Sequence, residues 1–144
     1  MIRLKNVFIA LAALATLAAC GGGKDEKPLD ITGEWNLVSI QTKSATLGGQ
    51  TVDVYILFAS DRSFTMYQKI GAGRYYKYSG TYVLDGATLS GKYSDGKLWG
   101  SSYEVELSSS SDSQMTLTSA SGEVDTYKKA SIPSDVVENS LISK

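Results

Sequence analysis

An alternation of apolar and polar residues with a period of two is the feature that most restricts the fold of this sequence. It runs almost without interruption from Ile31 to Ala130, with turn-forming residues between its segments. Side chains of a β-strand point alternately to the two faces of a sheet, so the pattern predicts strands that are buried on one side. We expect eight strands, at residues 33–42, 51–59, 63–70, 74–84, 87–93, 97–108, 114–119 and 123–129.

The links between these segments are short and rich in turn residues. Asp85-Gly86 and Asp95-Gly96 are examples, and Asp-Gly is among the strongest signals for a tight hairpin. Consecutive hairpins produce an antiparallel meander, and short twisted strands lose their free edges most simply by closing into a barrel. We therefore predict an all-β fold: an eight-stranded antiparallel up-and-down meander barrel over residues 30–130 with a short C-terminal tail over 131–144. A two-sheet sandwich is the alternative.

Placing the charged residues outside assigns the interior of this barrel. Asp53, Lys77 and Glu104, for example, point their neighbours inward. The predicted interior is unusually rich in aromatic residues, and those expected to line it for a ligand are Trp35, Tyr76, Tyr78, Tyr82, Tyr93, Trp99 and Tyr103. The opposite face is expected to expose Tyr55, Tyr67 and Tyr75.

The inward aromatic residues are compatible with two functions. An eight-stranded barrel has little room beyond its own side chains, so the rings can simply fill it; the protein is then a structural or adaptor module whose surface binds a protein or a glycan. Alternatively, the rings line a cavity that is apolar with a few hydroxyls, which suits one small amphipathic or hydrophobic ligand. Each buried phenol needs a hydrogen-bond partner in either case.

The first 19 residues are typical of a secretion signal. Two basic residues precede an apolar run from Val7 to Ala19, which is too short for a helix across about 30 Å of hydrocarbon. The run leads into Cys20, the single cysteine of the chain, and the sequence from Leu17 to Cys20 resembles the bacterial lipobox. The resemblance implies a signal peptide at 1–19 and lipidation of Cys20. An ordinary secretory signal with an incidental cysteine is the alternative.

Residues 20–29 have the composition of a flexible tether. Three glycines and four consecutive charged residues follow Cys20, and such a segment buries little apolar surface. No aspartate directly follows Cys20, so the usual inner-membrane retention signal of lipoproteins is missing. The resemblance implies an outer-membrane lipoprotein, on the periplasmic face or at the cell surface, held through the lipid on Cys20. The charged cluster is either a plain linker or an export signal to the outer face.

The residue inventory argues against catalysis and metal binding. The chain has no histidine and one cysteine, which excludes histidine-based triads, histidine or multi-cysteine zinc sites, and internal disulfides. Glu104 and Glu106 form a pair of carboxylates, but the alternation puts both on the outer face. We expect no enzyme activity, no catalytic residue, no cofactor and no metal. The net charge of −1 argues against a nucleic-acid partner, and no protein partner is identified.

The start of the first predicted strand carries a family resemblance. Gly33-Glu34-Trp35 resembles the Gly-x-Trp motif of lipocalins and the wider calycin group, in which the tryptophan closes the base of the barrel. With the meander and the lipobox, the chain is similar to small lipocalin-like lipoproteins of Gram-negative bacteria over residues 30–130. Two features depart from that pattern: only Lys128 or Lys129 is available where lipocalins stack an arginine on the tryptophan, and their middle Thr-Asp-Tyr motif is absent. The fold therefore carries over better than any binding specificity.

Overall fold

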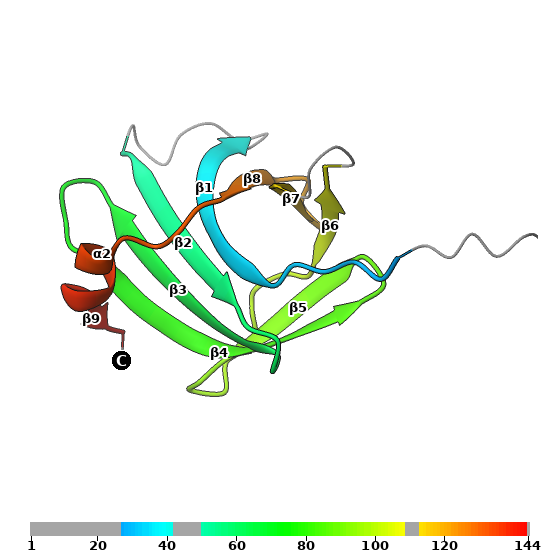
Figure 1. Cartoon of the computed structure of the whole chain (residues 1–144), viewed down its shortest axis with the longest axis horizontal. Coiled ribbons are helices and arrows are strands. Elements are labelled where there is room, and N and C mark those ends of the chain that lie inside the picture. The colour runs from blue at the N-terminus through cyan, green and yellow to red at the C-terminus, as the bar shows by residue number, and fades with distance from the viewer. Residues whose placement is uncertain (1–26, 42–49, 109–112, 144) are drawn as a thin grey trace, which may run out of the picture.

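The computed structural model describes residues 27–41, 50–108 and 113–143. In these ranges eight antiparallel strands follow one another around a barrel (Figure 1). The strands are β1 (Gly33–Gln41), β2 (Val52–Phe58), β3 (Ser63–Ile70), β4 (Tyr76–Asp85), β5 (Thr88–Tyr93), β6 (Tyr103–Leu107), β7 (Gln114–Ser119) and β8 (Val124–Lys129). Each pairs with the next in sequence, and β1 pairs with β8. The predicted up-and-down barrel is confirmed, and the two-sheet alternative is wrong.

The apolar core follows the predicted alternation. Along β2, the buried residues are Val54, Ile56 and Phe58, while the residues between them are only partly covered. The most completely buried large side chains of the described chain are Trp35, Phe58, Ile31, Leu89 and Met115. Burying a side chain of this size stabilises a fold by roughly 1.5–3 kcal/mol, so the barrel interior is the main source of stability.

The predicted strand 97–108 is too long, because residues 97–102 form a loop. Of the predicted segment, only the part that forms β6 pairs with β5 as a strand, at Thr88 with Glu104 and Leu89 with Tyr103. Leu98 makes one isolated bridge to Lys92. Gly96 adopts φ 90°, a conformation that favours glycine and ends the preceding strand in a turn. The pairing of β5 with β6 is therefore the shortest between neighbouring strands of the barrel.

The C-terminal tail crosses to the outside of the barrel (Figure 1). It forms a helical turn, α2 (Ser134–Glu138), and a short strand, β9 (Leu141–Ile142), which pairs in parallel with the beginning of β4. The backbone N–H of Ile132 donates to the Glu34 carboxylate on β1 at 2.8 Å, and Val136 of α2 is buried. Within the described ranges, no helix has both the length and the apolar character needed to cross a membrane.

This tail explains why the prediction for Tyr67 is wrong. Tyr67 lies on the outer side of β3, as the alternation requires, but it is buried with 5% exposure. The neighbouring phenol of Tyr55 is opposite it in register and is close enough to Asp135 of α2 to be affected by its charge. The tail thus covers an outer face that period-two reasoning left open to solvent.

Candidate functional site: an interior cavity and a side pocket

Trp35 closes the base of the barrel. Its side chain is fully buried, its indole Nε1 donates to the carbonyl oxygen of Ile31 at 2.8 Å, and Lys129 Nζ lies 5.3 Å from the ring centroid. Gly33 has φ 122°, which side chains disfavour. Both fixed residues of the Gly-x-Trp motif therefore shape the base. Of the two lysines predicted for the place where lipocalins stack an arginine, Lys129 lies over the Trp35 ring.

A cavity of about 110 Å³ lies inside the barrel, and Trp35 is not among its lining residues. Its aromatic wall consists of Phe58, Phe64, Tyr93, Trp99, Tyr103 and Tyr127, and the other lining residues are Ile56, Met66, Gly100, Leu117 and Asp125. The cavity thus lies among the other rings of the interior and does not reach Trp35. Of the residues predicted to line a ligand site, the structure brings Tyr93, Trp99 and Tyr103 together here.

Trp99 is held in the wall of the cavity by a glycine. A side chain at Gly91 would place its Cβ 2.4 Å from the indole Cε2 of Trp99, so only glycine leaves room for the ring. The backbone N–H of Trp99 donates to the Gly91 carbonyl at 2.9 Å. The indole then packs edge-on against Phe64, with centroids 5.0 Å apart, and against Tyr103 at 6.2 Å.

Asp125 is a lining residue that the sequence reasoning missed. It points to the same side of β8 as buried Tyr127, and its Oδ1 is buried without a hydrogen-bond partner. Burial, with a smaller contribution from Glu123, raises the pKa of Asp125 from 3.8 to about 6. The assumption that charged residues face outward fails for Asp125. The signal that could have identified Asp125 is its spacing of two residues from Tyr127, which places both side chains on one face of β8.

The raised pKa of Asp125 predicts a pH dependence of stability. Between about pH 4 and pH 6 the folded protein keeps a proton on Asp125 that the unfolded chain has released, so the free energy of unfolding falls as pH rises through this window. Asp125→Asn should lack this fall and be more stable than wild type at pH 7.5, by about 1 kcal/mol, because solvent screens a carboxyl group that is only partly buried. Urea denaturation at pH 4.5 and 7.5 measures the free energy of unfolding of wild type and Asp125→Asn. The prediction is contradicted if this free energy changes equally with pH in the two proteins.

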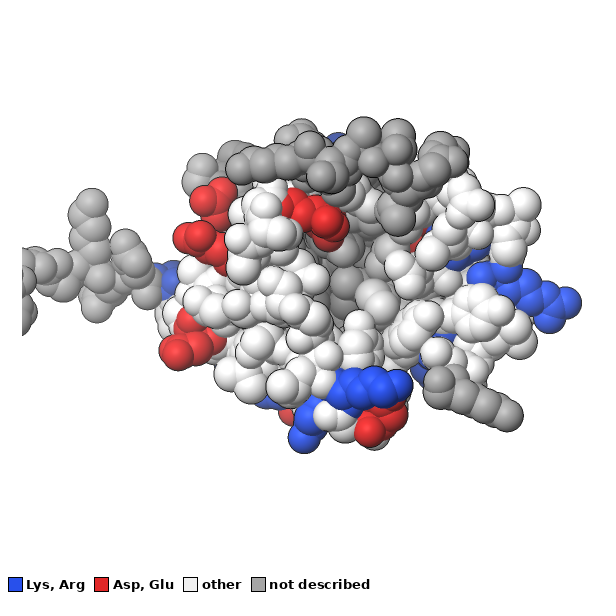
Figure 2. All heavy atoms as spheres, turned by 180° about the vertical axis from the view of Figure 1, so that it is seen from behind, with Lys and Arg blue, Asp and Glu red and all other residues white. Residues whose placement is uncertain are grey.

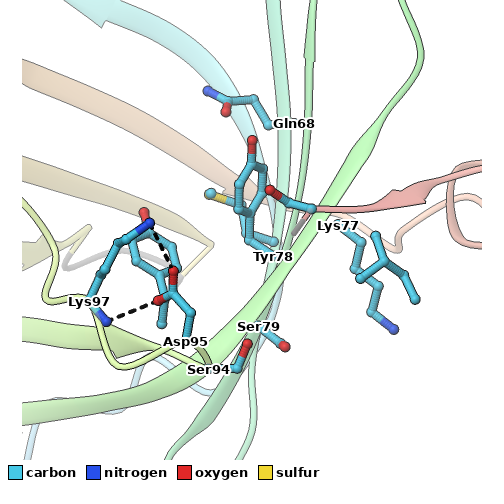
Figure 3. Close-up of a pocket in the computed structure, with 11 residues that line it drawn as sticks. Gln68, Lys77, Tyr78, Ser79, Ser94, Asp95 and Lys97 are labelled. Carbon is cyan, nitrogen blue, oxygen red and sulfur yellow. Dashed lines mark hydrogen bonds and ion pairs between the residues drawn. The ribbon is translucent and has the colours of Figure 1, made fainter.

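A second, larger pocket adjoins the cavity where β4 and β5 separate (Figure 3). Its volume is about 480 Å³, and it shares Met66 and Tyr93 with the cavity. Tyr78 and Gln68 lie on one side of it, and Asp95 and Lys97 on another. The Lys97 Nζ lies 3.2 Å from the Asp95 carboxylate. The cavity therefore shares part of its wall with a larger space that has both polar and apolar lining residues.

The remaining predicted residues lie elsewhere. Tyr78 lines the side pocket, with its ring 6.1 Å from that of Tyr93. Tyr82 is buried beside Phe58, where its hydroxyl donates to the Ala59 carbonyl at 2.9 Å. Tyr76 was expected inside but is 46% exposed, because it is the first residue of β4 and lies at the rim, beside β9. Neither Tyr76 nor Tyr82 lines the cavity.

The aromatic residues of the outer face form a polar contact of their own. The hydroxyl of Tyr75 donates to the carboxylate of Asp53, which also accepts a hydrogen bond from Asn36 Nδ2 at 3.2 Å. Burial and this carboxylate raise the pKa of the Tyr75 phenol. Tyr75 is consequently half-buried next to the tail, and it is a structural contact between β2 and the β3–β4 connection.

The charged side chains on the face seen from behind are scattered (Figure 2). Acidic and basic groups lie at several separate places among uncharged residues, and at the lower edge a basic and an acidic group appear together. Inside the barrel, the cavity is lined by one charged side chain of the described residues, Asp125.

Comparison with known proteins agrees with this geometry. The family model of the lipocalin-like domain matches residues 31–117, which is more than half of the chain. A search of curated proteins finds no match. Proteins of this family are generally not enzymes, and the barrel suggests binding of a hydrophobic ligand. The match includes the Gly-x-Trp segment at the base and most of the strands that enclose the cavity, and we conclude that this chain belongs to the lipocalin-like domain family.

Proposed function

We propose that this protein is a non-catalytic carrier or receptor that binds one small amphipathic ligand inside its barrel. The observation that carries the proposal is the aromatic cavity of about 110 Å³ adjoining a pocket of about 480 Å³. The cavity alone is smaller than the roughly 300–1,000 Å³ of ordinary ligand sites, but the side pocket falls in that range. A ligand that spans both has an apolar part against the rings and a polar part near Lys97 and Asp95.

We further propose that the domain works at the outer membrane, held there by lipid on Cys20. The support is the lipobox-like sequence, which lies outside the described residues. Acyl chains contribute about 0.8 kcal/mol per buried CH₂, so two or more of them make a lasting anchor. A lipid anchor keeps a small binding domain in the cell envelope, where its ligand would be captured or presented.

A binding screen of the full chain in dodecyl maltoside tests the proposed function. Fatty acids, sterols, haem-like planar molecules and short glycans are added, and the melting temperature and tryptophan emission are followed. A ligand at 100 times its dissociation constant should stabilise the fold by about 2.7 kcal/mol through mass action. Its arrival near Trp99 should also change the emission.

A cavity-filling variant supplies the control. Leu117 lines the cavity, so Leu117→Phe should weaken binding at least tenfold, whereas Val83→Phe adds the same ring at an exposed position and should leave binding unchanged. Near-ultraviolet circular dichroism verifies that both variants are folded. If nothing binds, or if Leu117→Phe has no effect on a bound compound, the carrier proposal is wrong and the adaptor alternative is favoured.

A further inference from the structure

The interior cavity holds a carboxylate with no counter-charge in the described part of the chain. Asp125 Oδ1 is buried and unpaired, and the residues opposite Asp125 in register are Ile40 on β1 and Leu117 on β7, both apolar. The ion pair that the structure contains in the described ranges joins Lys97 and Asp95 at the surface. An isolated charge in such surroundings is costly unless a partner compensates it.

Aromatic rings surround the same space. Phe64 lies 5.0 Å from Trp99 and 5.9 Å from Tyr93, between ring centroids, and Tyr103 completes the wall beside Trp99. The faces of aromatic rings carry partial negative charge and attract cations within about 6 Å. Rings and carboxylate therefore favour the same kind of group.

We propose that this cavity binds a small alkylammonium group, with the Asp125 carboxylate as its counter-charge and the rings of Trp99 and Tyr103 against its alkyl carbons. The rest of the ligand extends into the side pocket. This inference rests on the proposed function, because it names the chemical class of the ligand that enters the barrel. It extends beyond a merely hydrophobic ligand, which would leave the carboxylate uncompensated.

Trp99 adds a second requirement. Its indole Nε1 is buried and, like Asp125 Oδ1, has no hydrogen-bond partner. A ligand with a hydrogen-bond acceptor near its ammonium group would accept from the Trp99 N–H and place a positive charge against the Asp125 carboxylate. Choline, whose hydroxyl oxygen lies two carbons from the nitrogen, has this arrangement and is a suitable probe.

Calorimetry of the full chain in dodecyl maltoside tests the inference with a matched pair of probes. Choline carries the charge, and 3,3-dimethylbutan-1-ol has the same shape without it. At pH 7.5 choline should bind at least tenfold more tightly, because an opposite charge at close range shifts a carboxyl pKa by 1–3 units and the coupling is reciprocal. Asp125→Asn should abolish the difference, whereas Glu104→Gln, on the exposed outer face of β6, should retain it.

The pH dependence gives an independent readout. The other titratable groups near Asp125 are Glu123 on its own strand and the phenols of Tyr103 and Tyr127; the phenols stay neutral in this range. Choline affinity should fall about tenfold from pH 7.5 to pH 5 as Asp125 takes up a proton. At pH 6 choline binding should release protons, which buffers of different ionisation enthalpy reveal.

The outcomes separate this inference from the proposed function. Equal affinity for the two probes, or choline binding that survives Asp125→Asn unchanged, overturns the ammonium assignment while still supporting a ligand site. If amphiphiles from the screen bind but choline does not, the ammonium assignment is overturned and the proposed function is kept. If neither choline nor any screened compound binds, both proposals fail.

Discussion

Replacing Trp35 by alanine should lower the free energy of unfolding by about 3 to 5 kcal/mol, the range for truncating a large buried aromatic residue. The ring is fully buried, so its loss leaves a cavity at the base that the surrounding strands cannot close. The change also removes the hydrogen bond from Nε1 to the Ile31 carbonyl, made at 2.8 Å, and the platform for Lys129. Urea denaturation followed by far-ultraviolet circular dichroism measures the loss.

The conservative variant divides this loss into its causes. Trp35→Phe retains much of the ring but no N–H donor, which leaves the Ile31 carbonyl without that bond. Trp35→Phe should lower the free energy of unfolding by less than Trp35→Ala does. The difference between the two variants reports mainly the packing of the ring, because both lose the same hydrogen bond, which contributes about 0.5–1.5 kcal/mol. A loss below about 1 kcal/mol for Trp35→Ala would show that the indole is not the plug of the barrel.

Replacing Cys20 by alanine should abolish lipid attachment completely. The chain contains one cysteine, so on the proposed assignment no other thiol can take the acyl chains. The precursor should remain uncut, and incorporation of an alkyne-labelled fatty acid should fall to background. In Triton X-114 partitioning, the mature acylated form should disappear from the detergent phase, where only uncut precursor with its apolar segment Val7 to Ala19 can remain.

The neighbouring residue provides the matched control for this prediction. Gly21→Ala changes the residue next to Cys20 without touching the thiol, so labelling and partitioning should remain. Continued fatty-acid labelling of Cys20→Ala would refute the lipoprotein assignment and leave the ordinary secretory signal as the explanation. Neither result would bear on the ligand site, because the barrel begins after the tether.

The architecture was predictable because strand alternation and turn chemistry are local signals. The Asp85-Gly86 turn and the run from Val54 to Phe58 each specify their own conformation, and consecutive hairpins leave few ways to arrange the strands. The position of Trp35 was also accessible, because a short motif identifies it. Local patterns thus determined the barrel and its base.

The cavity was less predictable because it depends on contacts between distant segments. Trp99 lies in a loop and packs its ring over Gly91, eight residues earlier in the chain. The alternation of apolar and polar residues predicts a strand for this loop. Tyr67 is buried by a tail that follows more than sixty residues later. Asp125 was missed because a charged residue was assumed to face water, whereas its side chain lines the cavity with Oδ1 buried.

Native mass spectrometry of the protein purified from its own cells tests the central claim most directly, namely that the barrel interior holds a ligand. We expect one non-covalent molecule per chain, carrying a positive amine, that is retained in Val83→Phe and lost in Leu117→Phe, because only the second ring occupies the cavity. A chain that carries no adduct, or an adduct that persists in Leu117→Phe, would contradict the account.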